Sequence, residues 1–170
     1  MEGFGHSGIR TLIVIPCLNE AKTIEGLLVK FTDAMQGRLF SIVVADGGST
    51  DGTRDIVAAF AATDDRVTVL ANPKRIQSAG INLAVATFGE DFDYLIRIDA
   101  HGDYPDDYCQ RLIEDAERTG ADSVVVAMDT VGNGLFQRPR PSPRIPSSAM
   151  AVPSTAKARK ATGSITATTR

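Results

Sequence analysis

The sequence predicts a mostly parallel, doubly wound α/β sheet, and two observations support this fold class. Short runs of β-branched and apolar residues recur along the chain, as in strands that are buried on both faces. Between these runs, apolar residues recur at helical spacing. Strands that alternate with helices in this way form parallel sheets covered by helices on both sides.

The first strand and helix are predicted near the N-terminus. The run TLIVI, residues 11–15, is apolar or β-branched throughout and stops at Pro16. After Asn19, a predicted helix N-cap, apolar residues recur as one helical stripe. The members of this stripe are Ile24, Leu27, Leu28, Phe31 and Met35.

The strand and helix pattern then repeats to about residue 128. Further strands are predicted over 41–45, 66–71, 94–98 and 123–128, and further helices around 56–60 and 78–87 and from Pro105 onward. Asp51 or Thr53 is suited to cap the helix around 56–60. Pro105 and the two aspartates after it suit the first turn of a helix, where an N–H is not needed and acids meet the positive end of the dipole.

Charge and composition divide the chain into three parts. Residues 1–10 are polar and rich in glycine, and are predicted to be a flexible N-terminal arm. Residues 11–137 are predicted to form one folded domain; up to Gln137 the chain carries all 21 acids, 11 of the 18 basic residues and a net charge of −10. Residues 138–170 carry seven basic residues, five prolines and no acid, and are predicted to be disordered.

Several functional classes are disfavoured by composition. A net charge of −3 and a pI near 5.3 argue against nucleic-acid binding. The two cysteines, Cys17 and Cys109, lack the spacing of a zinc site or a disulfide framework. The N-terminus lacks the apolar core of a secretory signal, and the longest apolar run is too short to span a membrane. These features predict a cytoplasmic protein.

The residues that follow the predicted strands are the candidates for function, because ligands of such sheets bind beyond the carboxyl ends of the strands. Pro16, Asn19 and Glu20 follow the first strand. The acidic segments 46–51 and 99–103 follow two others.

The segment DGGSTDGT, which begins at Asp46, joins two glycine-enabled turns to a helix start. It is neither a Walker A loop nor a GxGxxG motif. Its aspartate could accept hydrogen bonds from a uracil N–H or from ribose hydroxyls, and its free backbone N–H groups could face phosphate. The alternative is an ordinary strand, turn and helix with a capping aspartate.

The segment IDAH places Asp99 and His101 two residues apart. The segment is predicted to be extended, so both side chains leave the same face. A carboxylate with an imidazole suits Mn²⁺, and a carboxylate alone suits Mg²⁺, so a divalent metal site is one interpretation. The alternative is a histidine that is merely exposed or packed.

Three segments in this order, VIPCLNE, VVADGGSTDGT and RIDAHGDYP, resemble the family 2 glycosyltransferases of the GT-A fold. Among these, the chain is most similar to bacterial exopolysaccharide enzymes of the succinoglycan type. The resemblance covers about residues 10–137. It implies a Rossmann-like sheet that binds the donor, a nucleotide diphosphate sugar, with UDP-sugar as the expected kind.

The resemblance also implies roles for individual residues. Pro16, Asn19 and Glu20 would line the nucleotide pocket, Asp46 would bind the uracil or ribose, and Arg75 would lie along the base or the diphosphate. Asp99 and His101 occupy the two acidic positions of the family's Asp-x-Asp motif. Asp99 would face the ribose and the metal, and His101 would be a metal ligand. The histidine departs from the commonest pattern, and Asp103 is a less favoured substitute.

The reaction implied is inverting transfer of the sugar to a glycan or lipid-linked acceptor, in synthesis of an exopolysaccharide or cell-surface polysaccharide. Full-length family members act at the cytosolic face of the inner membrane. Their base carboxylate lies downstream of the metal motif, where this chain has no acid after Asp129. We therefore interpret the sequence as that of a family member that is truncated or frameshifted after about Gln137.

Two alternatives to an active transferase remain. One is a catalytically inactive, truncated fragment that binds a nucleotide sugar. A nucleotidyltransferase is less favoured, because PCLNE stands where the glycine-rich basic loop of that class would follow the first strand.

Overall fold

The structure, a computed structural model, describes residues 8–126, 150–151 and 164–167. Seven strands and four α-helices are present in these ranges. The strands are β1 (Arg10–Cys17), β2 (Leu39–Asp46), β3 (Val67–Ala71), β4 (Tyr94–Arg97), β5 (Ser123–Val125), β6 (Met150–Ala151) and β7 (Ser164–Ala167). The helices are α1 (Ile24–Ala34), α2 (Thr53–Ala61), α3 (Gln77–Phe88) and α4 (Tyr108–Thr119), with a 3-10 turn at Gly89–Asp91.

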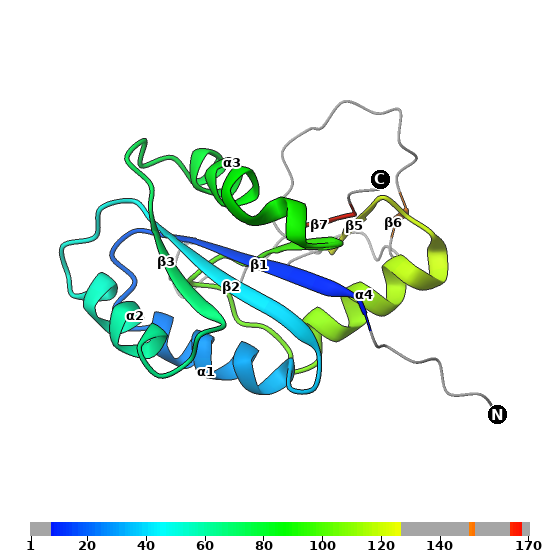
Figure 1. Ribbon diagram of the computed structural model, residues 1–170, viewed down its shortest axis with the longest axis horizontal. Helices are drawn as coiled ribbons and strands as arrows, with labels where there is room; N and C mark the ends of the chain where they lie inside the picture. Colours follow the sequence, from blue (N-terminus) through cyan, green and yellow to red (C-terminus); the bar gives the residue numbers. More distant parts are fainter. Residues whose placement is uncertain (1–7, 127–149, 152–163, 168–170) are drawn as a thin grey trace, which may run out of the picture.

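The strands form one sheet in the order β3-β2-β1-β4-β7-β5-β6 (Figure 1). The first four strands are parallel, as predicted. In the register of β1 and β2, Cys17 lies opposite Asp46, so both strands end at the same edge. The loops after β1, β2, β3 and β4 therefore meet at one edge of the sheet.

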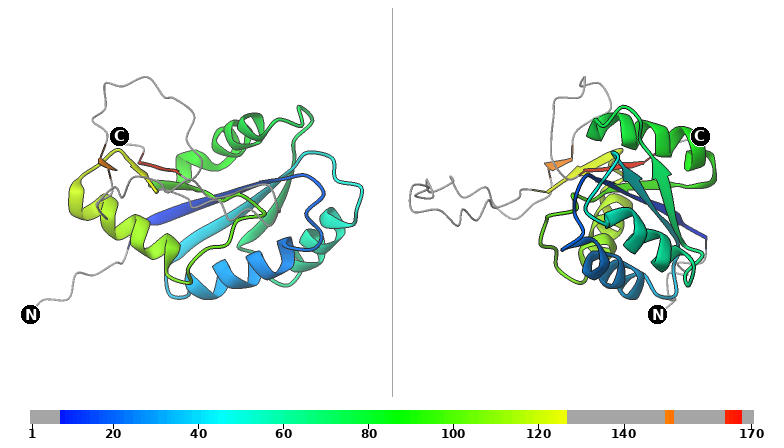
Figure 2. Two further views of the ribbon diagram at one scale, coloured as in Figure 1. Left: turned by 180° about the vertical axis from the view of Figure 1, so that it is seen from behind. Right: turned by 90° about the vertical axis from the view of Figure 1, so that its left-hand side faces the viewer.

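Helices cover both faces of the sheet, which confirms the doubly wound prediction. Helices α1, α2 and α4 lie on one face and α3 lies on the other (Figures 1 and 2). The predicted stripe on α1 is buried from Ile24 to Phe31 and contacts the sheet and α4 within one core cluster. Complete burial of one such side chain contributes about 1.5–3 kcal/mol, so this stripe fixes α1 on the sheet.

Three helix starts differ from the predictions. Helix α2 begins at Thr53 with Gly52 at the N-cap position, so neither Asp51 nor Thr53 is its cap. Helix α1 begins at Ile24 with Thr23 at the N-cap position, so Asn19 is not its cap. Asn19 instead has a left-handed backbone, with φ of 58°. Helix α4 begins at Tyr108, three residues after Pro105, because 106–107 form a turn that leads into the helix.

Within the segment 138–170, the structure describes two short strands, β6 and β7. Strand β7 is antiparallel to both β4 and β5, with Ile96 opposite Ile165, and β6 pairs with β5. In these six residues the segment is strand, which differs from the predicted disorder. The other residues of the segment, and residues 1–7 of the predicted N-terminal arm, lie outside the described ranges. The division of the chain near Gln137 stays a prediction.

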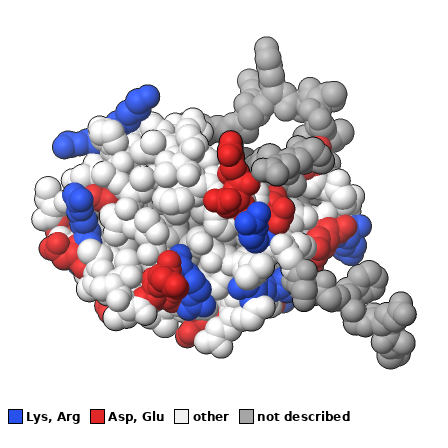
Figure 3. Space-filling model, viewed as in Figure 1, with Lys and Arg blue, Asp and Glu red and all other residues white. Residues whose placement is uncertain are grey.

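Helix α3 is unusual in its composition. It contains no charged residue over its twelve positions, and only Gly80 and Ala84 are buried. Figure 3 shows the matching uncharged area over α3 on this face of the molecule. Among the described residues, no helix is both long enough and apolar enough to cross a bilayer.

Candidate nucleotide-binding site

Asp46 ends β2 and is nearly completely buried, with 4% of its surface exposed. Its carboxylate accepts hydrogen bonds from the backbone N–H groups of Gly48 (3.2 Å) and Ser49 (3.1 Å) and from the Ser49 hydroxyl (2.5 Å). Gly48 has φ of 90°, a conformation that favours glycine. The glycine-rich segment therefore folds back over Asp46 and satisfies a carboxylate that burial would otherwise destabilise.

The β1–α1 loop is joined to the β2–α2 loop by four hydrogen bonds. The N–H of Asn19 donates to Ser49 Oγ (2.8 Å), and Asn19 Oδ1 accepts from the N–H of Thr50 (2.8 Å). The N–H of Glu20 donates to Thr53 Oγ1 (2.8 Å), and that of Ala21 donates to Asp51 (3.0 Å). These contacts make the two loops one rigid unit.

The β3–α3 loop carries Arg75 to the same edge. Its guanidinium lies against Gly48, where an added Cβ would come within 3.5 Å of Arg75 Nε. Arg75 is exposed and has a left-handed backbone, with φ of 55°. The guanidinium is thus presented to solvent beside the loop that encloses Asp46.

Asp99 follows β4 and is also nearly completely buried, at 5% exposure. One of its oxygens, Oδ1, accepts hydrogen bonds from Gln77 Nε2 (2.7 Å) and from an Arg97 guanidinium N–H (2.9 Å). Gln77 is the first residue of α3 and lies two positions after Arg75. The β3–α3 connection therefore contacts both the Asp46 loop and Asp99.

The segment from Asp99 to His101 is a turn, so the prediction of an extended segment is wrong. The N–H of Gly102 donates to the carbonyl of Asp99 (3.0 Å), which closes the turn. Asp99 is buried, whereas the His101 side chain is 75% exposed, with Nδ1 3.6 Å from Glu20 Oε1. The two side chains do not share one face, and the contact between His101 and Glu20 joins the β1 and β4 loops.

Among the described residues, protein side chains alone do not form a complete metal site. These residues contain no group of three or more histidine, cysteine, aspartate or glutamate side chains placed to hold an ion. Asp99 Oδ2 nevertheless accepts no hydrogen bond from the described part of the chain, and the His101 ring is accessible. One carboxylate oxygen and one imidazole are suitable donors for Mn²⁺.

Pro16 and Cys17 lie beneath the site. Pro16 is buried inside β1, opposite Ala45, so the structure places it under the loops. Cys17 Sγ is 3.9 Å from Asp46 Oδ1. Burial, together with the negative charges of Asp46, Glu20 and Asp51, raises the pKa of the Cys17 thiol to about 12. The thiol is therefore protonated at neutral pH and can donate to Asp46.

Three residues of the site were missed by sequence reasoning. Arg97 and Gln77 bind the Asp99 carboxylate, and the Tyr104 hydroxyl contacts the Asp99 main chain. Arg97 could have been found, because residues two apart at a strand end share a face. Gln77 and Tyr104 carry no such signal, since their contacts depend on how α3 and the loop before α4 pack.

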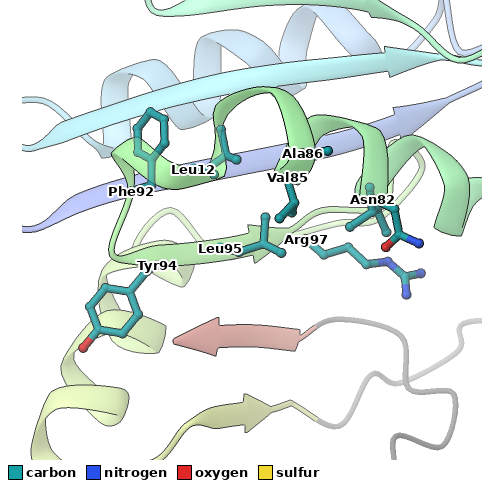
Figure 4. Close-up of a pocket in the computed structure, with 10 residues that line it drawn as sticks. Leu12, Asn82, Val85, Ala86, Phe92, Tyr94, Leu95 and Arg97 are labelled. Atoms are coloured by element: carbon teal, nitrogen blue, oxygen red, sulfur yellow. The ribbon is translucent and has the colours of Figure 1, made fainter. Parts of the chain in front are cut away.

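A groove of about 590 Å³ lies between α3 and β4. Its walls are mainly apolar and include Leu12, Val85 and Leu95. Figure 4 shows Arg97 and Asn82 at one end of the groove and Phe92 and Tyr94 at the other. Arg97 is the residue that connects this groove with Asp99.

The model of one protein family, described as glycosyl transferase family 2, matches residues 12–168. The chain belongs to this family. The match includes all four loops at the sheet edge and so confirms the resemblance inferred from the three motifs.

Two curated relatives place the chain within the family. It is 62% identical over 128 residues to the succinoglycan biosynthesis protein ExoA of Rhizobium meliloti, covering 75% of this chain and 39% of that protein. It is 31% identical over 133 residues to an undecaprenyl-phosphate mannosyltransferase of Micrococcus luteus, covering 77% of this chain and 53% of that protein. The chain thus spans about 40% to 50% of the length of these relatives.

Solved structures identify the fold as GT-A. A mannosyltransferase from Pyrobaculum calidifontis, in complex with GDP-mannose and Mn²⁺, superposes with a TM-score of 0.61 at 23% identity, covering 71% of this chain and 36% of that one. A glucosyl-3-phosphoglycerate synthase from Mycobacterium tuberculosis, in complex with Mn²⁺, UDP and product, gives 0.54 at 21% identity, covering 74% and 48%. These identities support the fold alone.

Proposed function

We propose that this chain binds a nucleotide diphosphate sugar, with a divalent metal, as the donor part of an inverting glycosyltransferase of exopolysaccharide or cell-surface polysaccharide synthesis. The observation that carries the proposal is the convergence of Asp46, Arg75 and Asp99 at one sheet edge. Hydrogen bonds and close contacts join the loops that bear them. The names of the ExoA and mannosyltransferase relatives support the same reaction class.

The nucleoside would be held by the loops after β1 and β2. The buried Asp46 can accept hydrogen bonds from a base N–H or from ribose hydroxyls, and the exposed Asn19 and the half-buried Glu20 stand at the rim. Arg75 would lie beside the base or the diphosphate, where a guanidinium can bind phosphate oxygens through two N–H groups. UDP is the expected nucleotide, and GDP is the alternative to compare.

The diphosphate would be held at Asp99 and His101 through a metal ion. Metal ions at phosphate sites commonly take only one or two protein ligands and complete their shell with water and substrate phosphate, which agrees with the small donor set here. Asp99 Oδ2 and the His101 imidazole would hold Mn²⁺ or Mg²⁺. When bound, the ion would neutralise charge on the diphosphate leaving group.

Transfer also needs a carboxylate that accepts the proton of the acceptor hydroxyl, which would be part of a glycan or of a lipid-linked sugar. An inverting reaction has this base on the face of the sugar opposite the leaving group. The second candidate is a nucleotide-sugar-binding fragment without transferase activity. Both candidates require the same donor site, and turnover distinguishes them.

The first experiment is calorimetric titration of UDP into the purified chain, with and without Mn²⁺, for the wild type and for Asp99→Ala. We expect Mn²⁺ to tighten UDP binding in the wild type and to have no effect in the variant, because Asp99 supplies a metal ligand. Ser78→Ala, at an exposed position of α3, is the matched control. A folded wild type that binds neither UDP nor GDP, or whose binding does not depend on Mn²⁺, would refute the proposal.

Turnover is measured next with radiolabelled UDP-sugars and membrane extracts as the source of acceptor. Sugar transfer that Asp99→Ala abolishes would establish an enzyme, and proton NMR of the product would report whether the anomeric centre is inverted. Donor binding without transfer would favour the inactive fragment.

A further inference from the structure

Asp99 is held at two separate places, its main chain and one oxygen of its carboxylate. The Tyr104 hydroxyl accepts a hydrogen bond from the Asp99 N–H (2.8 Å) and donates one to the Asp99 carbonyl (3.2 Å). The Asp99 Oδ1 atom accepts from Gln77 and from Arg97. A buried carboxylate with both kinds of restraint has little freedom to rotate.

The main-chain restraint is anchored in the core. The Tyr104 side chain is 5% exposed, and its ring packs against the rings of Phe31 (centroids 5.7 Å apart) and Tyr108 (4.9 Å apart). Burial raises the pKa of the Tyr104 hydroxyl, so it keeps its proton and can donate. The hydroxyl and the Gly102 N–H both reach the Asp99 carbonyl, so Tyr104 supports the turn that carries His101.

Gly102 provides the space for this arrangement. A Cβ at position 102 would lie 2.5 Å from the Tyr104 hydroxyl oxygen and 2.6 Å from two ring carbons. Such contacts are far shorter than van der Waals distances, so any larger residue would displace either the turn or the tyrosine. Tyr104 can therefore pack against the turn only because residue 102 is a glycine.

The carboxylate restraint uses two donors on a single oxygen. Gln77 Nε2 lies 2.7 Å and an Arg97 guanidinium nitrogen 2.9 Å from Oδ1. Because two N–H donors occupy Oδ1, the other oxygen carries the lone pairs available to a ligand. The Asp99 carboxylate is thereby oriented before any ligand binds.

We propose that Tyr104 and Gln77 are positioning residues, which orient Asp99 so that Oδ2 faces the metal-bound diphosphate. This inference rests on the proposed function and assigns the partners of its metal ligand. Loss of a group that orients a metal ligand commonly weakens metal affinity by about 10- to 100-fold. We expect this loss in Tyr104→Phe, which removes the hydroxyl, and in Gln77→Leu, which removes the amide.

The chain offers a matched control for each variant. Tyr108→Phe also removes a buried hydroxyl next to Tyr104, but this hydroxyl has no hydrogen-bond partner within the described residues. Ser78→Ala changes the exposed neighbour of Gln77. Gln77 is itself exposed, so Gln77→Leu leaves the core intact and keeps the test interpretable if Tyr104→Phe folds poorly.

The experiment titrates UDP into the full chain with and without Mn²⁺ and records the electron paramagnetic resonance spectrum of the bound Mn²⁺. Both variants should weaken Mn²⁺-dependent UDP binding about 10- to 100-fold and alter the Mn²⁺ spectrum. Binding of UDP without metal should be unchanged, because it depends on the Asp46 side of the site. Both controls should match the wild type.

Two results would overturn the inference, and they are distinguishable. If the wild type and the controls show Mn²⁺-dependent binding and both variants match them, Tyr104 and Gln77 do not position Asp99, while the proposed function stands. If the wild type itself shows no Mn²⁺-dependent binding, the proposed function fails and this inference fails with it.

Discussion

Asp46 ends β2 and Asp99 follows β4, on the two sides of β1 in the sheet. Both are nearly completely buried, but they are held in different ways. The hydrogen bonds to Asp46 come almost entirely from its own loop, through Gly48 and Ser49. Those to Asp99 come from α3, β4 and the loop before α4. One half of the site is thus built by local sequence, and the other depends on the packing of the whole domain.

Cys17 lies against Asp46 and Cys109 is buried in α4, and the largest expected effect is on the reactivity of these two thiols. Burial raises the pKa of both Cys17 and Cys109 to about 12, with nearby carboxylates adding to the effect at Cys17. Because only the thiolate reacts, alkylation by iodoacetamide at pH 8 should be about a thousandfold slower in the folded chain than in urea. Mass spectrometry of the two peptides measures each rate.

The variant Asp46→Asn distinguishes Cys17, which lies beside Asp46, from Cys109 in α4. Removal of the negative charge lowers the pKa of Cys17, so its alkylation should accelerate, while that of Cys109 stays unchanged. Equal acceleration at both cysteines would mean that the variant opens the whole domain, and would contradict a local effect of the Asp46 charge on Cys17.

The free energy of unfolding should fall as pH rises from about 9 towards 12. The folded pKa values of Cys17, Cys109 and Tyr108 are raised, so the unfolded chain releases these protons first and gains stability relative to the folded chain. Urea titrations at several pH values measure the slope. Cys17→Ser and Cys109→Ser should each flatten it, and a slope that neither change affects would contradict the assignment.

The Asp99 half should be sensitive to Gly102→Ala. The new Cβ overlaps Tyr104, and such overpacking costs about 1–3 kcal/mol of stability. Urea unfolding followed by circular dichroism checks this value. Gly26→Ala is the control, because nothing lies within 4 Å of its added Cβ in α1, and alanine there should stabilise the helix by about 0.5–1 kcal/mol. Equal effects from the two changes would refute the steric explanation.

A loss of stability that is similar to or smaller than that of Gly102→Ala is expected from Ser49→Ala in the Asp46 half. Its hydroxyl donates to Asp46 and accepts from the Asn19 N–H, and each such hydrogen bond contributes about 1 kcal/mol. The loss should appear in urea unfolding and in weaker metal-free UDP binding. Ser78→Ala, whose side chain is exposed, should change neither measurement.

The contrast between the halves also explains what sequence reasoning could find. The order of β1 to β4 along the chain and the convergence of their loops follow from strand and helix periodicity. The glycines after Asp46 predict the turn that encloses this residue. The period-two argument failed at His101 because it assumed extended backbone, whereas the Gly102 N–H closes a turn there. Gln77 and Tyr104 reach Asp99 only through packing, which periodicity does not encode.

The strand β7 was missed for a related reason. Its sequence, SITA, lies in a segment poor in apolar residues, and its partner β4 is about 70 residues earlier in the chain. A strand that is defined by its place between two others gives little signal of its own.

The left-handed backbone of Arg75 lowers the stability of the fold, while its side chain places a cation beside the Asp46 loop. A residue other than glycine, asparagine or aspartate loses about 1 kcal/mol or more in this conformation, so Arg75→Gly should make the fold more stable. The same change would remove the cation beside the Asp46 loop. Selection for thermostability alone would therefore discard this arginine, whereas selection for the proposed donor site would keep it.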